Sequence, residues 1–327
     1  MPLALSCASH SPLMRDGDAP GATRFAVDRA FAELSANMEG FAPDLAIQFS
    51  PDHFNGFFYD MMPPYCVGVA ADSVGDWNTK AGPLNVPEAL ATDLTRHLID
   101  HGLDAAISYR MQVDHGFVQI WEKTIGHADR IPLIPIFINC AAPPLPTMRR
   151  LRELGEAVGA YALSLDKNVL IVASGGLSHD PPTPQISGAP ANIRDRLIAN
   201  RNPPPEARAI KEQKILAAGK SAAIGDAGIL PVSPEWDHAF LATLTGPDPR
   251  ALDAMTIAEI VEKAGRGGPE VLCWVAAMAA LRAGGAIETT LHHYEAVQGW
   301  IAGMAILSGH QKVQTGITSD CHKNRHL

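Results

Sequence analysis

The chain has 327 residues, 46% of them hydrophobic and 19% charged, which is the composition of a globular protein and not of a disordered one. Its formal net charge of −9 disfavours nucleic acid and anionic membrane surfaces as partners. The five cysteines form no CxxC pair, which is typical of reduced thiols. The N-terminus has no basic leader, and the longest apolar run, 271–281, is too short for a span of roughly 20 residues. We therefore expect a soluble, cytoplasmic protein.

Strand-like and helical segments alternate along the chain. Short apolar or β-branched runs predict strands at residues 3–7, 45–49, 132–138 and 169–173. Helical patterns with proline near their start or glycine near their end predict helices at residues 22–40, 87–101, 146–165 and 269–284. The alternation indicates an α/β fold, and we expect a mixed, largely parallel central sheet flanked by helices.

Two segments depart from this alternation. The proline-rich stretch 181–205 predicts a long irregular excursion, after which helix resumes at Glu206. Residues 314–327 are polar and without periodicity, so we expect a surface tail there. We interpret residues 1–313 as a single catalytic domain.

Three histidines, His10, His53 and His179, follow predicted strands. Open α/β sheets bind ligands at the carboxyl edge, where loops from several strands converge, so these side chains are expected to face one cleft with a metal site at that end of the strands. A single loop histidine is more often a surface or hydrogen-bonding residue. The shared position of all three makes a common site the better hypothesis.

His115 and Glu270 are two further candidates. His115 lies ahead of a predicted helix, and Glu270 lies in the first turn of an apolar helix. Alone, Glu270 is explained as an acidic group favoured by the helix macrodipole. With two histidines it would complete the two-histidine, one-carboxylate ligand set of non-haem Fe(II) oxygenases. Periodicity does not choose between these readings.

Five segments resemble, in order, the motifs of the class III extradiol ring-cleavage dioxygenases. They are ASHSP at 8–12, SPDHFN at 50–55, DHGF at 114–117, SGGLSHD at 174–180 and GGPEVL at 267–272. The likeness extends from the N-terminus to about residue 313. It implies an Fe(II) ion held by His10, His53 and Glu270, with His115 and His179 beside it as uncoordinated acid–base residues. By the same resemblance His179 removes a catechol proton and His115 donates one during ring cleavage.

The resemblance also implies a reaction. It is extradiol (meta) cleavage by O₂ of a catechol with a carboxyalkyl side chain, with 3-(2,3-dihydroxyphenyl)propionate as the leading substrate, by a homo-oligomer in aromatic catabolism. Three alternatives remain at this point: the same scaffold acting on protocatechuate, gallate or 2-aminophenol, a zinc hydrolase with the same three ligands, and a non-catalytic metal-binding protein. Two additional titratable histidines argue against the last, because binding a metal does not require them.

Other polar residues have simpler explanations. His97 and His101 lie four apart on a predicted helix, but no third ligand is placed to join them, so a solvated helix face is the better interpretation. Asp52 and Asp114 adjoin candidate histidines, and either orient them or form turns.

Overall fold

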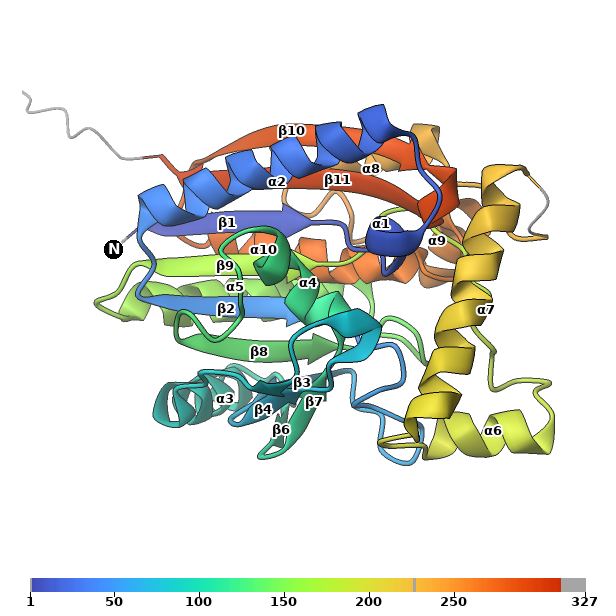
Figure 1. Ribbon diagram of the computed structural model, residues 1–327. Coiled ribbons are helices and arrows are strands. Elements are labelled where there is room, and N and C mark those ends of the chain that lie inside the picture. The colour runs from blue at the N-terminus through green and yellow to red at the C-terminus, as the bar shows by residue number, and fades with distance from the viewer. Residues whose placement is uncertain (1, 226–227, 313–327) are drawn as a thin grey trace, which may run out of the picture.

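A mixed sheet of eight strands runs through the middle of the molecule (Figure 1). The computed structural model describes residues 2–225 and 228–312. In spatial order the sheet consists of β10 (Ile287–Val297), β11 (Ala302–Gln311), β1 (Leu3–Ala8), β9 (Val169–Ser174), β2 (Leu45–Ser50), β8 (Leu133–Ile138), β3 (Tyr65–Gly68) and β6 (Ala106–Ser108). A second, three-stranded sheet has the order β5 (Gly82–Pro83), β4 (Ala71–Ser73) and β7 (Met111–Val113).

The four central strands, β1, β9, β2 and β8, are parallel to one another. Every residue in them is buried, and Leu5 and Ile47 both lie opposite Ile171 in the register. β11 pairs antiparallel with β1, and β3 pairs antiparallel with β8. The expected mixed, largely parallel sheet is therefore confirmed. Strands covered on both faces are continuous apolar runs, which is why the sequence marks all four.

Helices cover both faces of this sheet (Figure 1). One face packs against α2 (Gly21–Phe41) and α4 (His115–Lys123), and the other against α3 (Glu88–Asp100), α5 (Met148–Ser164) and α10 (Val271–Arg282). The remaining helices are α1 (Leu13–Asp16), α6 (Ala191–Ile198), α7 (Pro205–Ala223), α8 (Pro234–Thr245) and α9 (Ile257–Ala264), with short 3-10 turns η1 (Asp76–Asn78), η2 (Gly268–Glu270) and η3 (Gln298–Trp300).

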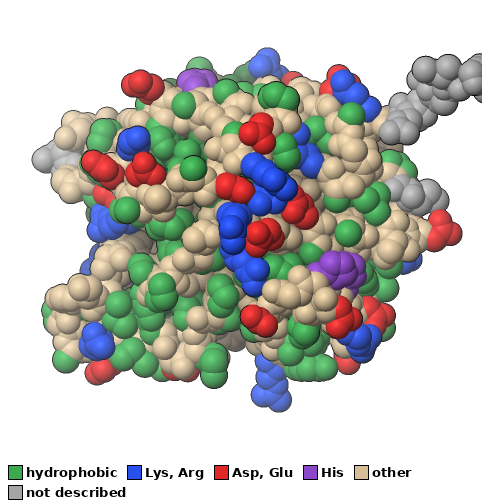
Figure 2. All heavy atoms as spheres, turned by 180° about the vertical axis from the view of Figure 1, so that it is seen from behind, with side chains coloured by type: hydrophobic (Ala, Val, Ile, Leu, Met, Phe, Trp, Pro, Cys, Tyr) green, Lys and Arg blue, Asp and Glu red, His purple; other side chains and the backbone are tan. Residues whose placement is uncertain are grey.

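α5 and α10 pack against each other at a close contact. A Cβ added at Gly155 would lie 2.0 Å from the carbonyl oxygen of Ala276, so only glycine permits this separation of the two helices. The outer side of α5 carries ion pairs such as Arg149 with Glu153. Seen from behind, acidic and basic side chains are interspersed at the centre of the molecule, so that region carries no extended patch of one charge (Figure 2).

Two expectations need correction or completion. The stretch 181–205 was expected to be irregular throughout, but it contains α6, whose start follows Pro190. Proline is tolerated at the start of a helix, so a proline-rich composition does not exclude a short one. Helix then resumes in α7, as predicted. The antiparallel pair β10 and β11 was not predicted, and the tail at 314–327 lies outside the described residues.

The described cysteines, Cys7, Cys66, Cys140 and Cys273, are buried free thiols. Among residues 2–225 and 228–312, no helix combines the length and apolar character that crossing a membrane requires.

Candidate active site

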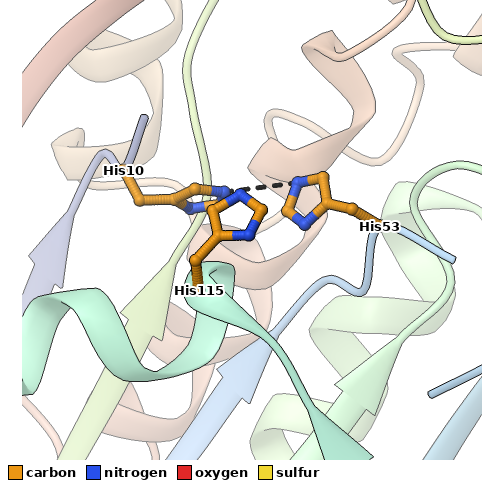
Figure 3. A group of neighbouring side chains, drawn as sticks. All are labelled: His10, His53 and His115. Atoms are coloured by element: carbon orange, nitrogen blue, oxygen red, sulfur yellow. Dashed lines mark hydrogen bonds between the residues drawn. The ribbon is translucent and has the colours of Figure 1, made fainter. Parts of the chain in front are cut away.

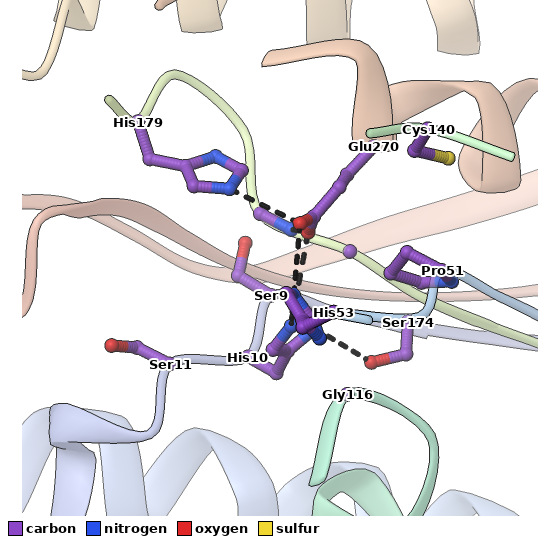
Figure 4. Close-up of polar contacts among 12 residues, drawn as sticks. Ser9, His10, Ser11, Pro51, His53, Gly116, Cys140, Ser174, His179 and Glu270 are labelled. Carbon is purple, nitrogen blue, oxygen red and sulfur yellow. Dashed lines mark hydrogen bonds and ion pairs between the residues drawn. The ribbon is translucent and has the colours of Figure 1, made fainter. Parts of the chain in front are cut away.

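The carboxyl edge of the parallel strands brings the candidate residues together: His10, His53, His179 and Glu270 in Figure 4, and His115 beside His10 and His53 in Figure 3. His10 lies two residues beyond the end of β1, and His53 lies three residues beyond the end of β2. His179 follows β9, His115 is the first residue of α4, and Glu270 ends η2 directly ahead of α10. Because β1, β9 and β2 are neighbours in the sheet, their loops open into the same space.

Three donor atoms from three of these residues converge. Nε2 of His10 lies 3.3 Å from Nε2 of His53 and 3.8 Å from Oε2 of Glu270. Nε2 of His53 lies 3.2 Å from Oε1 of Glu270. In an octahedral site with bonds of about 2.1 Å, neighbouring donors are separated by about 3 Å. The two imidazoles and the carboxylate are therefore spaced as a set that could hold one metal ion.

Polar partners on the far side of each imidazole fix its orientation. Nδ1 of His53 donates to Oδ2 of Asp114 at 3.0 Å. Nδ1 of His10 lies 3.1 Å from Oγ of Ser174, the last residue of β9. When each ring is neutral with its proton on Nδ1, as metal binding requires, the lone pair of Nε2 faces the other donors.

Asp114 and Asp52 have different structural roles: Asp114 orients a candidate histidine, and Asp52 stabilises a turn. Asp114 both orients His53 and caps α4, accepting from the amide of Gly116 at 2.9 Å. Its burial opposes ionisation, but His53 outweighs this and lowers the pKa of Asp114. Asp52 forms a turn by accepting from amides such as that of Gly56 at 2.9 Å. Burial, together with the nearby Asp114 charge, raises the pKa of Asp52 to about 7.

Glu270 is a buried carboxylate with several partners. Its Oε2 accepts from the amide of Gly176 at 2.8 Å, and its Oε1 lies 3.2 Å from Nε2 of His179. Burial disfavours the charged form, but the histidines, His179 first and His10 next, hold the pKa of Glu270 well below its usual range. Glu270 is therefore ionised at neutral pH and offers an anionic oxygen to the site.

The histidines differ in their protonation. Burial lowers the pKa of His10 to about 3, so its imidazole is neutral and can coordinate a metal. Burial also disfavours the charged form of His53, but Asp114 more than compensates and raises the pKa of His53 well above its usual range. In the metal-free site His53 therefore carries a proton that a bound cation would displace.

The start of α4, which carries His115, lies across His10 and His53 from Glu270, as the position of Gly116 in Figure 4 shows. The ring of His115 stacks on that of His53 with centroids 4.5 Å apart and lies edge-on to that of His10 at 5.6 Å (Figure 3). Nδ1 of His115 donates to Oδ2 of Asp76 at 2.6 Å, and the main-chain amide of His115 donates to Oδ1 at 2.8 Å. Ligand atoms of His10, His53 and His115 lie within 4.8 Å of one another, so a fourth nitrogen is close to the three donors described above.

His179 is oriented through both of its ring nitrogens. Nδ1 donates to the carbonyl oxygen of Leu177 at 2.8 Å, which directs Nε2 toward Glu270. Burial disfavours the charged ring, but the Glu270 carboxylate outweighs it and raises the pKa of His179. The ring has little free space, because a Cβ at Gly267 would lie 2.0 Å from its Nε2.

The sequence reading missed three residues that hold the candidates in place: Asp76, Ser174 and Gly176. Ser174 and Gly176 belong to the quoted 174–180 segment, so their position was visible although their role was not. Asp76 had no signal, since it lies in an irregular stretch 39 residues before His115. His97 in α3 contacts His101, which directly follows the helix; His101 is exposed as expected, but His97 is half-buried, with its Nε2 3.1 Å from the carbonyl oxygen of Ala157 in α5.

Comparisons with known proteins agree over almost the whole chain. The family model for the catalytic LigB subunit of aromatic ring-opening dioxygenase matches residues 4–305. A 2,3-dihydroxyphenylpropionate/2,3-dihydroxicinnamic acid 1,2-dioxygenase of Photorhabdus laumondii is 47% identical over 316 residues, covering 97% of this chain and 100% of the relative. A Rhodococcus protein of the same name is 48% identical over 306 residues, covering 94% and 98%.

A solved structure of an uncharacterized Escherichia coli K12 protein, JW3007, covers 94% of this chain and 99% of its own at 16% identity and a TM-score of 0.49, a similarity too low to carry an argument. The family match and the full-length relatives are sufficient to assign the family of this chain. This chain belongs to the LigB family of class III extradiol dioxygenases, the enzymes that open aromatic rings with O₂.

Proposed function

We propose that this dioxygenase uses Fe(II) to cleave 3-(2,3-dihydroxyphenyl)propionate, or its cinnamate counterpart, in the degradation of aromatic compounds. The observation that carries the proposal is the convergence of His10, His53 and Glu270, within 3.2–3.8 Å of one another, in a chain 47% identical to a dioxygenase named for these substrates. Enzymes of this family depend on a metal, and iron is the part we propose.

The donor set fits a ferrous ion. Two imidazole nitrogens and one carboxylate oxygen are the facial ligand set typical of non-haem Fe(II), and they leave coordination positions open on one side. The side chain of His53 is 27% exposed while that of His10 is 4% exposed, so the open side of the cluster is the one at His53. When bound there, iron would supply the electron-transfer chemistry between catechol and O₂.

His179 is placed to receive a proton from the substrate. A catechol must lose a proton to become a chelating anion, and an imidazole titrating near neutral pH is suited to take it. Nε2 of His179 faces the Glu270 carboxylate, so a proton taken up at this atom is stabilised by an adjacent negative charge. We assign the base role to Nε2 of His179.

His115 is placed to return a proton on the opposite side. Its Nδ1 donates to Asp76, whose carboxylate is itself held by the main-chain amide of His115, so a turn of the ring would break the Nδ1 hydrogen bond. An acid is needed when the ring carbon–carbon bond is cleaved, because charge then develops on oxygen. We assign this role to His115.

We propose that the chain forms one catalytic domain and assembles with further copies of itself. Residues 1–313 act as one catalytic domain with 314–327 as a polar tail, supported by a family match that ends at residue 305. We further propose a cytoplasmic homo-oligomer. The 11-residue strand β10 lies at an edge of the sheet with Leu291 45% exposed, and such an edge offers unpaired backbone to a second copy.

The experiment that tests the function is a panel of catechols in an oxygen electrode with anaerobically Fe(II)-loaded protein. We expect one O₂ consumed per 3-(2,3-dihydroxyphenyl)propionate with formation of a yellow ring-fission product. Protocatechuate, gallate and 2-aminophenol should react far more slowly. Faster turnover of any of these three would replace the proposed substrate, and absence of O₂ uptake with every catechol would overturn the function.

A further inference from the structure

Helix α7 crosses the carboxyl edge of the parallel strands, so that the arrows of β1 and β2 point toward it (Figure 1). Its C-terminal half is fixed by close packing, since a Cβ at Gly219 would lie 2.8 Å from both the carbonyl oxygen of Gly299 and the side chain of Leu13. Its N-terminal half reaches the loops that carry the candidate active site. There the contacts come from Arg208, Lys211 and Glu212, which are three and four residues apart and so share one face of the helix.

Two of these side chains are cations whose hydrogen-bond partners are neutral main-chain carbonyl groups. Nζ of Lys211 donates to the main-chain carbonyl of His53 at 2.9 Å. Nη1 of Arg208 donates to the carbonyl of Val74 at 3.1 Å, and Nε of Arg208 is buried without a hydrogen-bond partner among the described residues. Val74 lies two residues before Asp76, so the two cations reach the site from its His53 side and its His115 side.

Two other basic groups, Arg266 and Arg201, are already neutralised. Arg266 forms two hydrogen bonds with the carboxylate of Asp180, at 2.6 and 3.2 Å. Arg201 does the same with Asp60, at 2.6 and 3.1 Å. Neither Arg208 nor Lys211 forms an ion pair within residues 2–225 and 228–312, so their charges are available to an anion that enters the site.

The third side chain on this face, Glu212, forms no ion pair with either cation among the described residues and is directed to the main chain of the η1 turn. Its Oε1 accepts from the main-chain amide of Trp77 at 3.0 Å, which ties α7 to the η1 turn. The ring of Trp77 lies 6.2 Å from that of His115, so this contact joins the helix to the loop that holds His115. The helix is thereby fixed at two points along its length, and its cations are presented over the site.

We infer that Lys211 and Arg208 bind the side-chain carboxylate of the catechol and determine the preference for carboxyalkyl substrates. This inference rests on the proposed function. The two methylene groups of a propionate place its carboxylate on the order of 5 Å from the nearer catechol oxygen. Lys211 contacts the main chain of His53, itself a proposed ligand, which places its ammonium group beside the proposed metal site. A carboxylate there would give Lys211 a charged partner and Arg208 an acceptor for its buried Nε.

The test compares two catechols that share a ring and differ in one group: 3-(2,3-dihydroxyphenyl)propionate and 3-ethylcatechol. Lys211→Met and Arg208→Met should each lower kcat/KM for the propionate by about 10- to 100-fold, mainly through KM, while changing kcat/KM for 3-ethylcatechol by less than about threefold. Lys214→Met, an exposed cation on the same helix, is the matched control and should leave both values unchanged.

A second measurement does not depend on turnover. Calorimetric titration of 3-phenylpropionate, which has the carboxylate but no catechol, should show weaker binding to both Met variants by the same factor and unchanged binding to Lys214→Met. Equal losses on the propionate and on 3-ethylcatechol, or unchanged 3-phenylpropionate binding, would overturn the inference while leaving the proposed function standing. A wild-type protein that cleaves neither catechol would instead refute the proposed function, and the calorimetric comparison would still decide whether these cations bind the carboxylate.

Discussion

Asp76 holds His115 through both of its carboxylate oxygens, with Oδ2 2.6 Å from Nδ1 and Oδ1 accepting from the main-chain amide at 2.8 Å. Both residues are buried. The pair resembles the carboxylate–histidine arrangement in which an acid fixes the tautomer of a catalytic imidazole. Asp76 is therefore a positioning residue for the proposed acid His115.

Asp76→Asn should uncouple metal binding from turnover. The amide keeps the size of the carboxylate but removes the charge that fixes the His115 tautomer, so we expect full iron content and a single-turnover rate lower by about 10–10²-fold. His115→Ala, which removes the acid itself, should lose about 10²–10⁴-fold. Iron stoichiometry, thermal midpoint and single-turnover rate are measured on the same preparations. A wild-type rate in iron-replete Asp76→Asn would show that Asp76 only supports the loop.

Glu270→Ala should lower metal occupancy together with activity. Glu270 supplies the anionic oxygen of the donor set, and we expect its loss to weaken Fe(II) affinity by more than about 100-fold, beyond the effect of changing an outer partner. His10→Ala and His53→Ala should behave in the same way, with the fold retained. The exposed Glu262→Ala is the control. Full iron content with wild-type turnover in Glu270→Ala would remove that residue from the ligand set.

The sequence predicted the central sheet better than its edges, for a physical reason. β1, β2, β8 and β9 are buried on both faces and are therefore uninterrupted apolar runs. β10 is half-exposed, contains adjacent His292 and His293, and has an irregular register with β11 between Leu291 and His293. Its pairing depends on β11, whose own partner is the first strand of the chain, and no local pattern reveals such a contact.

Site residues that follow long buried strands could also be placed from the sequence, whereas those that follow very short strands could not. His10 and His53 could be placed because each follows a recognisable strand, and the family of the chain is as the motifs indicated. Asp76 and His115 also come together because the strands that precede them are paired. β4 and β7 run parallel with Ser73 opposite Val113, so residues just beyond their ends come together. Both strands are three residues long, too short to be recognised from sequence.

Fe(II) and Zn²⁺ should have opposite effects on activity. Both metals accept imidazole and carboxylate ligands, but zinc has no redox chemistry to offer O₂. We expect zinc-loaded protein to bind catechol and to consume no O₂, and added zinc to inhibit the iron enzyme in competition with Fe(II). Metal content is measured alongside O₂ uptake. Undiminished ring cleavage by iron-free, zinc-loaded protein would contradict the proposed mechanism.

His10 should make a pH-dependent contribution to the stability of the metal-free protein that is lost in mild acid. The pKa of His10 is lowered to about 3 by burial, against 6.5 for an unperturbed histidine, so between these values the unfolded chain binds a proton that the folded chain does not. His10 therefore contributes a free energy of unfolding that rises with pH from about 3 to about 6.5, by at most about 1.4 kcal/mol per pH unit, and is constant above that range.

His10→Gln should flatten this dependence. Urea unfolding at pH 5.0 and 7.5, with chelator present, gives the difference in free energy of unfolding for each protein. The difference should be smaller in His10→Gln than in wild type. His53 has a raised pKa, so its contribution is lost as pH rises above its unfolded value and has the opposite sign. His53 and His179, whose pKa is also raised, are present in both proteins, so an equal pH dependence in variant and wild type would show that His10 is not a buried neutral imidazole.

Gly267→Ala should displace His179, whereas the amide of Glu270 should keep its hydrogen bond to the carbonyl oxygen of residue 267. The added Cβ would lie 2.0 Å from Nε2 of His179 and 2.2 Å from its Cδ2, too close for the ring to stay in place. We expect the iron content to be retained and the single-turnover rate to fall toward that of His179→Ala, by about 10²–10⁴-fold. Gly40→Ala, in α2 where a Cβ would meet nothing within 4 Å, is the matched control and should be neutral or slightly stabilising.

The pH profile of kcat/KM separates this mechanism from a general loss of packing, because displacing one proposed proton-transfer group should remove or distort one limb of a bell-shaped curve. If Gly267→Ala lowers the rate only in proportion to its thermal midpoint, with both limbs unchanged, His179 is not the proton acceptor.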